Sequence, residues 1–358
     1  MESIPESLAD ITTAWLREHL GDGVELVSTV PMPGMVGILG EVGILTVECP
    51  GGDPPSSFIA KLPLQNDVAQ MYNSAMNFYA RESGWYRDAD VDSPFRTPHV
   101  FVNEFDADTG RAVLLLEKVE ADDYGDILEG VSFERHAAVV DALARQHGAF
   151  WESPVLDEFG WLWDWNSPGW RNGGELMVSV WPIFHEARPG VFSDELRDYL
   201  GRTFVADVDG WLSFFATLPT TLCHGDFQLD NVLFDADGPI IIDFQMNMRS
   251  FPGADLGWYL SSSLPGDQIA FEDELIDRYI ATLAAAGGPQ YSRDAMLGEL
   301  ALFTMQMLTG QTLANLQETD DYGDHGPRMR KRLDAFLHGT LDAAARWDTI
   351  DRVQRLRG

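Results

Sequence analysis

The chain is poor in cysteine, in basic residues and in long apolar runs. Its 358 residues include only two cysteines, Cys49 and Cys223, too few for a disulfide framework and not at any zinc-ligand spacing. This cysteine usage is typical of a reducing cytosol. The opening residues contain no basic region followed by an apolar one, and no apolar run approaches the length needed to span a membrane. We therefore expect a cytoplasmic protein without membrane contact.

Basic residues are outnumbered: 24 Lys and Arg stand against 57 Asp and Glu, for a net charge of −33. A surface of this sign repels the phosphates of nucleic acids and of anionic lipids, so neither is expected as a partner. The acidic excess either attracts cationic ligands or is a solvated shell without meaning for ligand binding. With 45% hydrophobic residues, the chain is long enough for two domains that each bury a core.

The most informative segment is Cys-His-Gly-Asp-Phe-Gln-Leu-Asp-Asn at 223–231, followed by Ile-Asp-Phe-Gln at 242–245. Phosphoryl transfer needs a carboxylate near the attacking hydroxyl, oxygen ligands for Mg²⁺ and a cation for the phosphates. Asp226 is placed to act as the base, while Asn231 and Asp243 offer oxygen ligands of the kind Mg²⁺ prefers. Turn capping would explain single residues but not the whole string.

The first third of the chain predicts an antiparallel sheet with one main helix. Strand-like patterns cover residues 24–30, 42–49, 57–62, 99–105 and 112–117, and a helical pattern covers 67–87. Lys61 falls in the third strand and Glu82 in the helix, an arrangement suited to a phosphate-binding Lys with a partner carboxylate. Gly37 and Gly40 lie between the first two strands, where backbone N–H groups could cover phosphates, although they do not spell GxGxxG.

The remainder predicts a mostly helical domain with one hairpin. Helical periodicity covers residues 133–151, 194–218, 271–286, 296–316 and 329–347, while only 232–234 and 240–244 are strand-like. Two features of this predicted domain each allow two interpretations. Asp255 either caps the helix that follows it or braces the catalytic loop. The cluster of Trp161, Trp163, Trp165 and Trp170 either lines an acceptor pocket or packs inside the domain.

Together these motifs resemble the aminoglycoside and choline kinase superfamily. The resemblance is carried by the string at 223–231 with 242–245, by Phe-Ile-Ala-Lys-Leu-Pro at 58–63, by Glu-Ser-Gly-Trp-Tyr at 82–86 and by Leu-Leu-Leu-Glu at 114–117. The ending Asp-Phe-Gln is most similar to the ecdysteroid kinase-like (CHK kinase-like) group. The resemblance implies an α+β, two-lobed protein-kinase-like fold, with residues 1–118 as an ATP-binding N-lobe and residues 119–358 as a C-lobe holding the catalytic loop, metal site and acceptor pocket.

The resemblance also implies residue roles. Asp226 would be the catalytic base, Asn231 and Asp243 would hold Mg²⁺, and Lys61, paired with Glu82, would contact the phosphates of ATP. A hinge that hydrogen-bonds adenine would consist of Glu117, Lys118 and Val119. Gln245 stands where protein kinases have the Gly of Asp-Phe-Gly, so regulatory roles of that glycine do not carry over.

The predicted activity is ATP-dependent O-phosphotransfer to a hydroxyl of a small metabolite or antibiotic. A nucleotide-binding pseudokinase without turnover and a metal-dependent phosphohydrolase are the alternatives. The acidic balance favours a cationic acceptor such as an aminoglycoside or amino alcohol, whereas the tryptophans favour an apolar, steroid-like alcohol or a macrolide. The choice between ATP and GTP and the oligomeric state are equally open.

Overall fold

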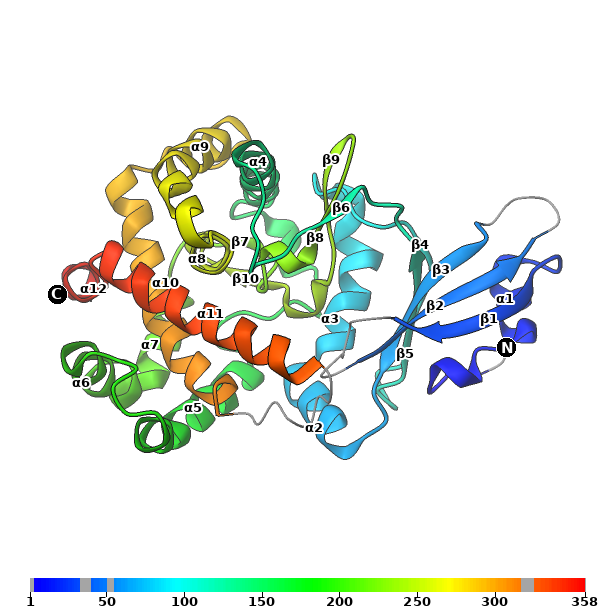
Figure 1. Ribbon diagram of the computed structural model, residues 1–358, viewed down its shortest axis with the longest axis horizontal. Coiled ribbons are helices and arrows are strands. Elements are labelled where there is room, and N and C mark those ends of the chain that lie inside the picture. The colour runs from blue at the N-terminus through cyan, green and yellow to red at the C-terminus, as the bar shows by residue number, and fades with distance from the viewer. Residues whose placement is uncertain (1–2, 33–39, 50–54, 317–324, 358) are drawn as a thin grey trace. The chain divides into compact units, whose positions relative to one another are not determined.

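The computed structural model describes residues 3–32, 40–49, 55–316 and 325–357, which form two compact units (Figure 1). The first unit comprises Met1–Asp92, Arg96–Ala121 and Ile240–Met246; the second comprises Ser93–Phe95, Asp122–Pro239 and Asn247–Gly358. The short segment 240–246 therefore belongs to the first unit although its neighbours in sequence belong to the second. It carries Asp243.

The first unit is built on a five-stranded antiparallel sheet in the order β1-β2-β3-β5-β4, as the sequence predicts. Its strands are β1 (Glu25–Pro31), β2 (Gly40–Glu48), β3 (Ser57–Pro63), β4 (Val100–Phe105) and β5 (Ala112–Glu117). Alternating side chains of β2 and β3, such as Leu45 and Phe58, enter a core that α1 (Thr13–Leu20) closes with Trp15 and Leu16.

The predicted helix over 67–87 is interrupted. It consists of α2 (Asp67–Met76) and α3 (Phe78–Gly84), followed by a turn of π-helix over Trp85–Ala89. Asn77 separates α2 from α3 with φ 56°, a left-handed conformation that asparagine adopts more readily than most residues. Every residue of α3 is buried, and the Tyr79 hydroxyl donates to the Leu62 carbonyl of β3 at 2.8 Å. The break lets α3 lie against the sheet.

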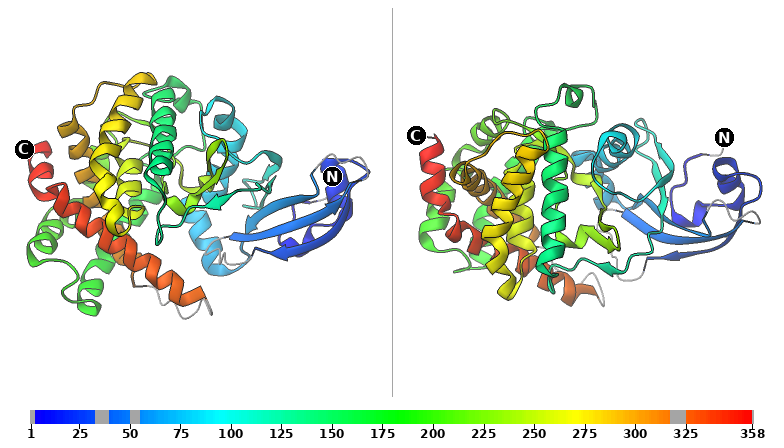
Figure 2. Two further views of the ribbon diagram at one scale, coloured as in Figure 1. Left: turned by 45° about the horizontal axis from the view of Figure 1, so that its top comes forward. Right: turned by 90° about the horizontal axis from the view of Figure 1, so that it is seen from above.

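The second unit is mostly helical. Its helices are α4 (Phe133–Ala149), α5 (Pro168–Ala187), α6 (Asp194–Arg202), α7 (Val208–Phe215), α8 (Gly253–Ser262), α9 (Glu272–Ala285), α10 (Arg293–Ala314), α11 (Gly326–Arg346) and α12 (Thr349–Arg357). The long helix α10 is buried over most of its length and packs against α5, α8, α11 and α12, while α4 runs along α9 (Figure 2). Among the described residues, no helix combines the length and apolar character needed to cross a membrane.

Short strands frame the segment that carries the motif. The predicted hairpin is present as β8 (Val232–Asp235) and β9 (Gly238–Ile241), which form a small sheet with β6 (Asp123–Tyr124). A second pair, β7 (Thr221–Cys223) and β10 (Met248–Ser250), was not predicted. Strands of two or three residues are too short to show the alternation that identifies a strand in sequence.

Several helices differ from the predictions, and α12, the short helix after α11, was not predicted. The predicted helix over 194–218 is divided into α6 and α7, because the Asp207 side chain accepts from the Gly210 N–H and starts a new helix there. Helix α5 was not predicted at all. Its sequence contains Pro182 and the pair Gly173-Gly174, all of which are signals against a helix.

The contact between α8 and α11 permits a test of the packing. A Cβ atom at Gly339 of α11 would lie 2.0 Å from the Ser261 carbonyl oxygen of α8, whereas a Cβ at Gly173 of α5 would meet nothing within 4 Å. We expect Gly339→Ala to lower the free energy of unfolding by about 1–3 kcal/mol, because the helices must move apart. Gly173→Ala, the control, should raise it by up to about 1 kcal/mol. Urea denaturation of both variants measures the difference, and equal effects would contradict the close contact.

Candidate functional site

In the first unit, the side chain of Lys61 contacts two carboxylates. Its Nζ lies 2.9 Å from Glu82 Oε1 on α3 and 2.8 Å from Asp243 Oδ1. The structure thus brings together the strand lysine and helix glutamate that the sequence pairs, and adds Asp243 to them. Burial alone would lower the pKa of Lys61, but Asp243 and Glu82 outweigh it and raise that pKa above its usual value. Lys61 is therefore a cation at neutral pH.

Asp243 has a constrained backbone. Its φ is 68°, a left-handed conformation that costs a non-glycine residue on the order of 1–3 kcal/mol and persists only where the surroundings enforce it. The Ile241 N–H donates to the Arg96 carbonyl at 2.8 Å on one side. On the other side, the ring of Phe244 stacks on Trp85 at 4.0 Å between centroids. Strain of this kind gathers at functional sites, where it aims a side chain.

The remaining residues predicted to contact nucleotide are less closely grouped. Gly37 lies outside the described residues, and Gly40 begins β2 opposite Pro63. Glu117 ends β5 with an exposed side chain, and its N–H already donates to the His99 carbonyl at 2.7 Å. Contacts from this hinge to adenine would therefore use the Glu117 carbonyl and the backbone of Lys118 and Val119. Their role remains a prediction.

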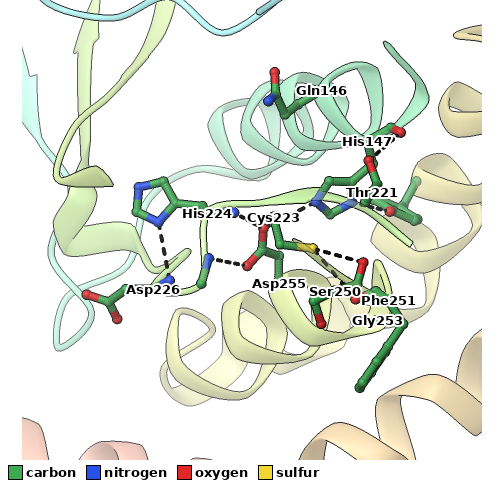
Figure 3. Close-up of polar contacts among 12 residues, drawn as sticks. Gln146, His147, Thr221, Cys223, His224, Asp226, Ser250, Phe251, Gly253 and Asp255 are labelled. Atoms are coloured by element: carbon green, nitrogen blue, oxygen red, sulfur yellow. Dashed lines mark hydrogen bonds and ion pairs between the residues drawn. The ribbon is translucent and has the colours of Figure 1, made fainter. Parts of the chain in front are cut away.

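In the second unit, β7 leads into the turn that carries Asp226. Gly225 adopts φ 80°, and the ring nitrogen Nδ1 of His224 accepts from the Asp226 N–H at 3.3 Å (Figure 3). His224 thus shapes the turn. The Asp226 carboxylate accepts from Gln228 Nε2 at 3.0 and 3.1 Å and from Asn231 Nδ2 at 3.0 Å. Because Asn231 presents its nitrogen to Asp226, its Oδ1 is the amide atom suited to bind a cation.

Asp255 of α8 braces the turn that carries Asp226. The buried carboxylate accepts from the His224 N–H at 2.6 Å and from the Gly225 N–H at 2.8 Å, with His147 Nε2 at 3.2 Å (Figure 3). Burial alone would raise the pKa of Asp255, but His147, His224 and the Gly225 N–H outweigh it and hold that pKa below its usual value. Asp255 makes no capping hydrogen bond to α8. The structure therefore favours the bracing interpretation.

His147 of α4 extends this network and was missed in the sequence. Its Nδ1 lies 2.6 Å from the Tyr279 hydroxyl of α9, so a ring protonated on Nε2 donates to Asp255 and accepts from Tyr279. The donor atoms of His147, Cys223 and Asp255 lie within 4.8 Å of one another. Burial raises the pKa of the Cys223 thiol, which keeps it protonated, and Asp255 already accepts from two backbone groups. This cluster is a hydrogen-bond network rather than a metal site.

Comparison with protein families shows which family the chain belongs to. A family model described as the phosphotransferase enzyme family matches residues 55–297, which include Lys61, Glu82, Asp226, Asn231 and Asp243. The chain belongs to this phosphotransferase family. No curated protein sequence matches the chain well enough to serve as a relative.

Solved structures share the fold of this phosphotransferase. An aminoglycoside 2′-phosphotransferase-IIIa in complex with GDP aligns with a TM-score of 0.57 and 14% identity, over 92% of this chain and 97% of the other. A choline kinase from Cryptosporidium parvum Iowa II gives 0.56 and 10%, over 93% and 96%. A macrolide 2′-phosphotransferase from Brachybacterium faecium gives 0.50 and 13%, over 93% and 98%. These likenesses confirm the predicted α+β, kinase-like fold.

The tryptophan cluster of this phosphotransferase contributes to its core. Trp161 and Trp165 are buried, and Trp165 Nε1 donates to Ser250 Oγ at 3.0 Å. The ring of Trp165 also packs against Phe215 and Phe251. For these two residues the packing interpretation holds, whereas Trp163 and Trp170 are only half-buried.

Helix α8, which carries Asp255, is itself capped from α10 of the phosphotransferase. The buried Glu299 carboxylate accepts from the Gly253 N–H at 2.9 Å and from the Tyr291 hydroxyl at 2.5 Å. Pro252, which precedes the helix, offers no capping side chain, so Glu299 takes its place. Burial raises the pKa of Glu299 to about 7, although Tyr291 and the Gly253 N–H partly offset this.

Replacing Asp255 tests the brace. In Asp255→Asn, one carboxylate oxygen becomes an NH₂ group that must face a backbone N–H or His147, which leaves a buried donor unsatisfied. We expect the free energy of unfolding to fall by about 1–3 kcal/mol. Urea denaturation measures this, with the exposed Asp267→Asn as a control that should change it by less than about 0.5 kcal/mol. A variant as stable as wild type would contradict the brace.

The raised pKa of Glu299 predicts a pH dependence of stability. Between the usual carboxyl pKa of 4.5 and about 7, the unfolded chain has lost this proton while the folded protein keeps it, so stability falls as pH rises through that window. Glu299→Gln keeps both contacts and cannot ionise. The free energy of unfolding of the variant, relative to that of wild type, should therefore rise between pH 5 and 7.5 by an amount on the order of 1–3 kcal/mol, which urea denaturation at each pH measures. Parallel pH profiles would show that the pKa of Glu299 is not raised.

Proposed function

We propose that the protein is an ATP-dependent O-phosphotransferase that moves the γ-phosphate of ATP to a hydroxyl of a small molecule. Family membership establishes phosphotransfer, and the single observation that carries the proposal further is the contact of Lys61 with both Glu82 and Asp243. A phosphate-binding Lys held by a helix Glu is the arrangement that kinase-like enzymes use for ATP. A metal-dependent phosphohydrolase would leave Lys61 without a purpose.

Each residue then has a role in one reaction. Asp226 accepts the proton of the acceptor hydroxyl, while the amides of Gln228 and Asn231 hold its carboxylate in place. Lys61 neutralises phosphate charge, and Glu82 keeps its ammonium group positioned. The oxygen atoms of Asn231 and Asp243 fit Mg²⁺, a hard cation that takes oxygen ligands. When bound, Mg²⁺ would neutralise charge on the phosphate oxygens of the nucleotide.

The proposal also assigns a function to each of the two predicted lobes. Residues 1–118 would bind ATP, with Gly37, Gly40 and the hinge of Glu117, Lys118 and Val119 around the nucleotide. Residues 119–358 would supply the base and the acceptor pocket. GDP is the nucleotide named for the aminoglycoside phosphotransferase of similar fold, which keeps GTP as an alternative donor to be tested.

The proposed acceptor is a small hydroxylated compound. Solved proteins of this fold are named for aminoglycosides, macrolides and choline, all of which carry hydroxyl groups. The ending Asp243-Phe244-Gln245 supports the ecdysteroid kinase-like branch, whose expected acceptors are apolar alcohols, whereas the net charge of −33 favours a cationic one. A screen of both classes, read as ADP formation from ATP, distinguishes them.

Replacing the proposed base provides the decisive experiment. Asp226→Ala should reduce phosphate transfer to the identified acceptor by at least about 10²-fold, since it removes the general base. Binding of ADP, measured by calorimetry, should remain within a few-fold of wild type. Turnover at the wild-type rate would refute the assignment of Asp226.

Asp237→Ala is the matched control, because Asp237 is an exposed Asp in the turn between β8 and β9. It should leave both transfer and binding unchanged. Binding of ATP without transfer to any acceptor would identify a pseudokinase. Release of phosphate from phosphate esters in the absence of nucleotide would identify a phosphohydrolase.

A further inference from the structure

One carboxylate of the motif has no role in the proposed function. Asp230 directly precedes Asn231, and its side chain is only 15% exposed. Its Oδ1 accepts from the Ile127 N–H at 2.8 Å, and its Oδ2 lies 2.5 Å from Arg332 Nη2. Both oxygens are thus engaged by groups of the protein. Asp230 therefore belongs to the support of the turn and not to its chemistry.

The first of these contacts comes from the loop before α4. In this loop Gly125 donates its N–H to the Val232 carbonyl at 2.8 Å. A Cβ at Gly125 would lie 1.9 Å from the Leu229 carbonyl oxygen, so the loop passes directly against the turn that precedes Asn231. The Leu229 N–H is held in addition by Ser263 Oγ at 3.0 Å. The turn is therefore fixed through its backbone on this side.

The second contact comes from α11, a helix remote in sequence. Arg328, Arg332 and Phe336 recur at intervals of four residues and so share one face of α11. Phe336 stacks on Trp258 of α8 at 5.4 Å between ring centroids. With Gly339 pressed against the Ser261 carbonyl of the same helix, α11 has a fixed position on α8. Because α11 is fixed on α8, Arg332 is held in place beside Asp230.

We propose that Arg332 is a positioning residue of the phosphotransfer reaction. Its ion pair with Asp230 holds the turn over 229–231 and thereby fixes the direction in which Asn231 presents its amide oxygen. Asn231 Nδ2 contacts the Asp226 carbonyl at 2.8 Å and its carboxylate at 3.0 Å, so a rotation of this turn would disturb both proposed functional side chains. The inference rests on the proposed role of Asn231 as a ligand of Mg²⁺.

The chain provides a matched control one helical turn away. Arg328 forms the same kind of ion pair with Asp126, at 2.7 Å, but its side chain is 56% exposed against 27% for Arg332. Asp126 contacts no proposed ligand or base directly; it lies between Gly125 and Ile127, in the loop that packs against the turn. Arg332→Met and Arg328→Met therefore each remove one arginine from α11, and only the first touches the turn that carries Asn231.

The experiment measures ADP affinity by calorimetry with Mg²⁺ and with EDTA, in the full chain. We expect Arg332→Met to reduce the gain in affinity due to Mg²⁺ by about tenfold, the size usual for residues that orient metal ligands, without changing the affinity in EDTA. Arg328→Met should leave both affinities as in wild type. Arg332→Lys should restore part of the gain, because it keeps the charge but not the fork of donors.

The outcomes separate this inference from the proposed function. If Mg²⁺ does not change the ADP affinity of wild type, the proposed function fails and the inference fails with it. If wild type depends on Mg²⁺ and Arg332→Met depends on it equally, only the positioning role is refuted. A loss of the same size in Arg328→Met also refutes it. If Arg332→Met does not fold, the comparison is made between Arg332→Lys and Asp230→Asn, which should both lose part of the gain.

Discussion

The first unit depends on how it holds the ammonium group of Lys61, whose side chain is only 12% exposed. Lys61 extends from the sheet into a buried environment, where an ammonium group is stable only if carboxylates surround it. Glu82 meets this need from α3, and Asp243 meets it from a segment more than a hundred residues further along the chain. The pair of contacts explains why residues 240–246 belong to the first unit. The stacking of Phe244 on Trp85 and the contact of Arg81 with the Met246 carbonyl then complete their attachment.

In the second unit, the turn that carries Asp226 and Asn231 is held in a different way, through its backbone groups. This turn has little regular structure, so its backbone groups need partners from elsewhere. On the N-terminal side of Asp226, the Asp255 carboxylate of α8 accepts two backbone N–H groups of the turn. On its C-terminal side, Asp230 accepts the N–H of a neighbouring loop. Helices α8 and α11 therefore hold opposite ends of one turn. Their own contact at Gly339 makes the two ends part of a single support.

The sequence predicted the motif residues and the sheet because both depend on local signals. Lys61 stands in an alternating strand, and Asp226 and Asn231 stand in a string whose spacing is itself informative. The residues that support the turn were missed because their role depends on contacts between distant segments. In sequence, His147 looks like an ordinary helix residue, and Arg332 looks like a surface charge. Local signals also misled where they conflict with packing, as in α5, whose prolines and glycines conceal a helix, and at Asn77, which divides a helical pattern.

The buried acids among the described residues differ in what holds them. Glu82 contacts Lys61, and Glu272 contacts Arg346, so each is paired with a cation. Burial nevertheless raises the pKa of Glu82 to about 7, although Lys61 acts in the opposite direction. Asp255 and Glu299 are instead held by backbone N–H groups and by the side chains of His147 and Tyr291. The kind of partner does not by itself decide the pKa: burial raises the pKa of Glu82 and of Glu299 to about 7, whereas the contacts of Asp255 outweigh burial and lower its pKa. The carboxylates of Asp255, from α8, and of Glu299, from α10, both lie at the first turn of α8. Of these two, only Glu299 has a pKa near neutral pH, so it is the acid through which a change of protonation reaches the support of the turn that carries Asp226.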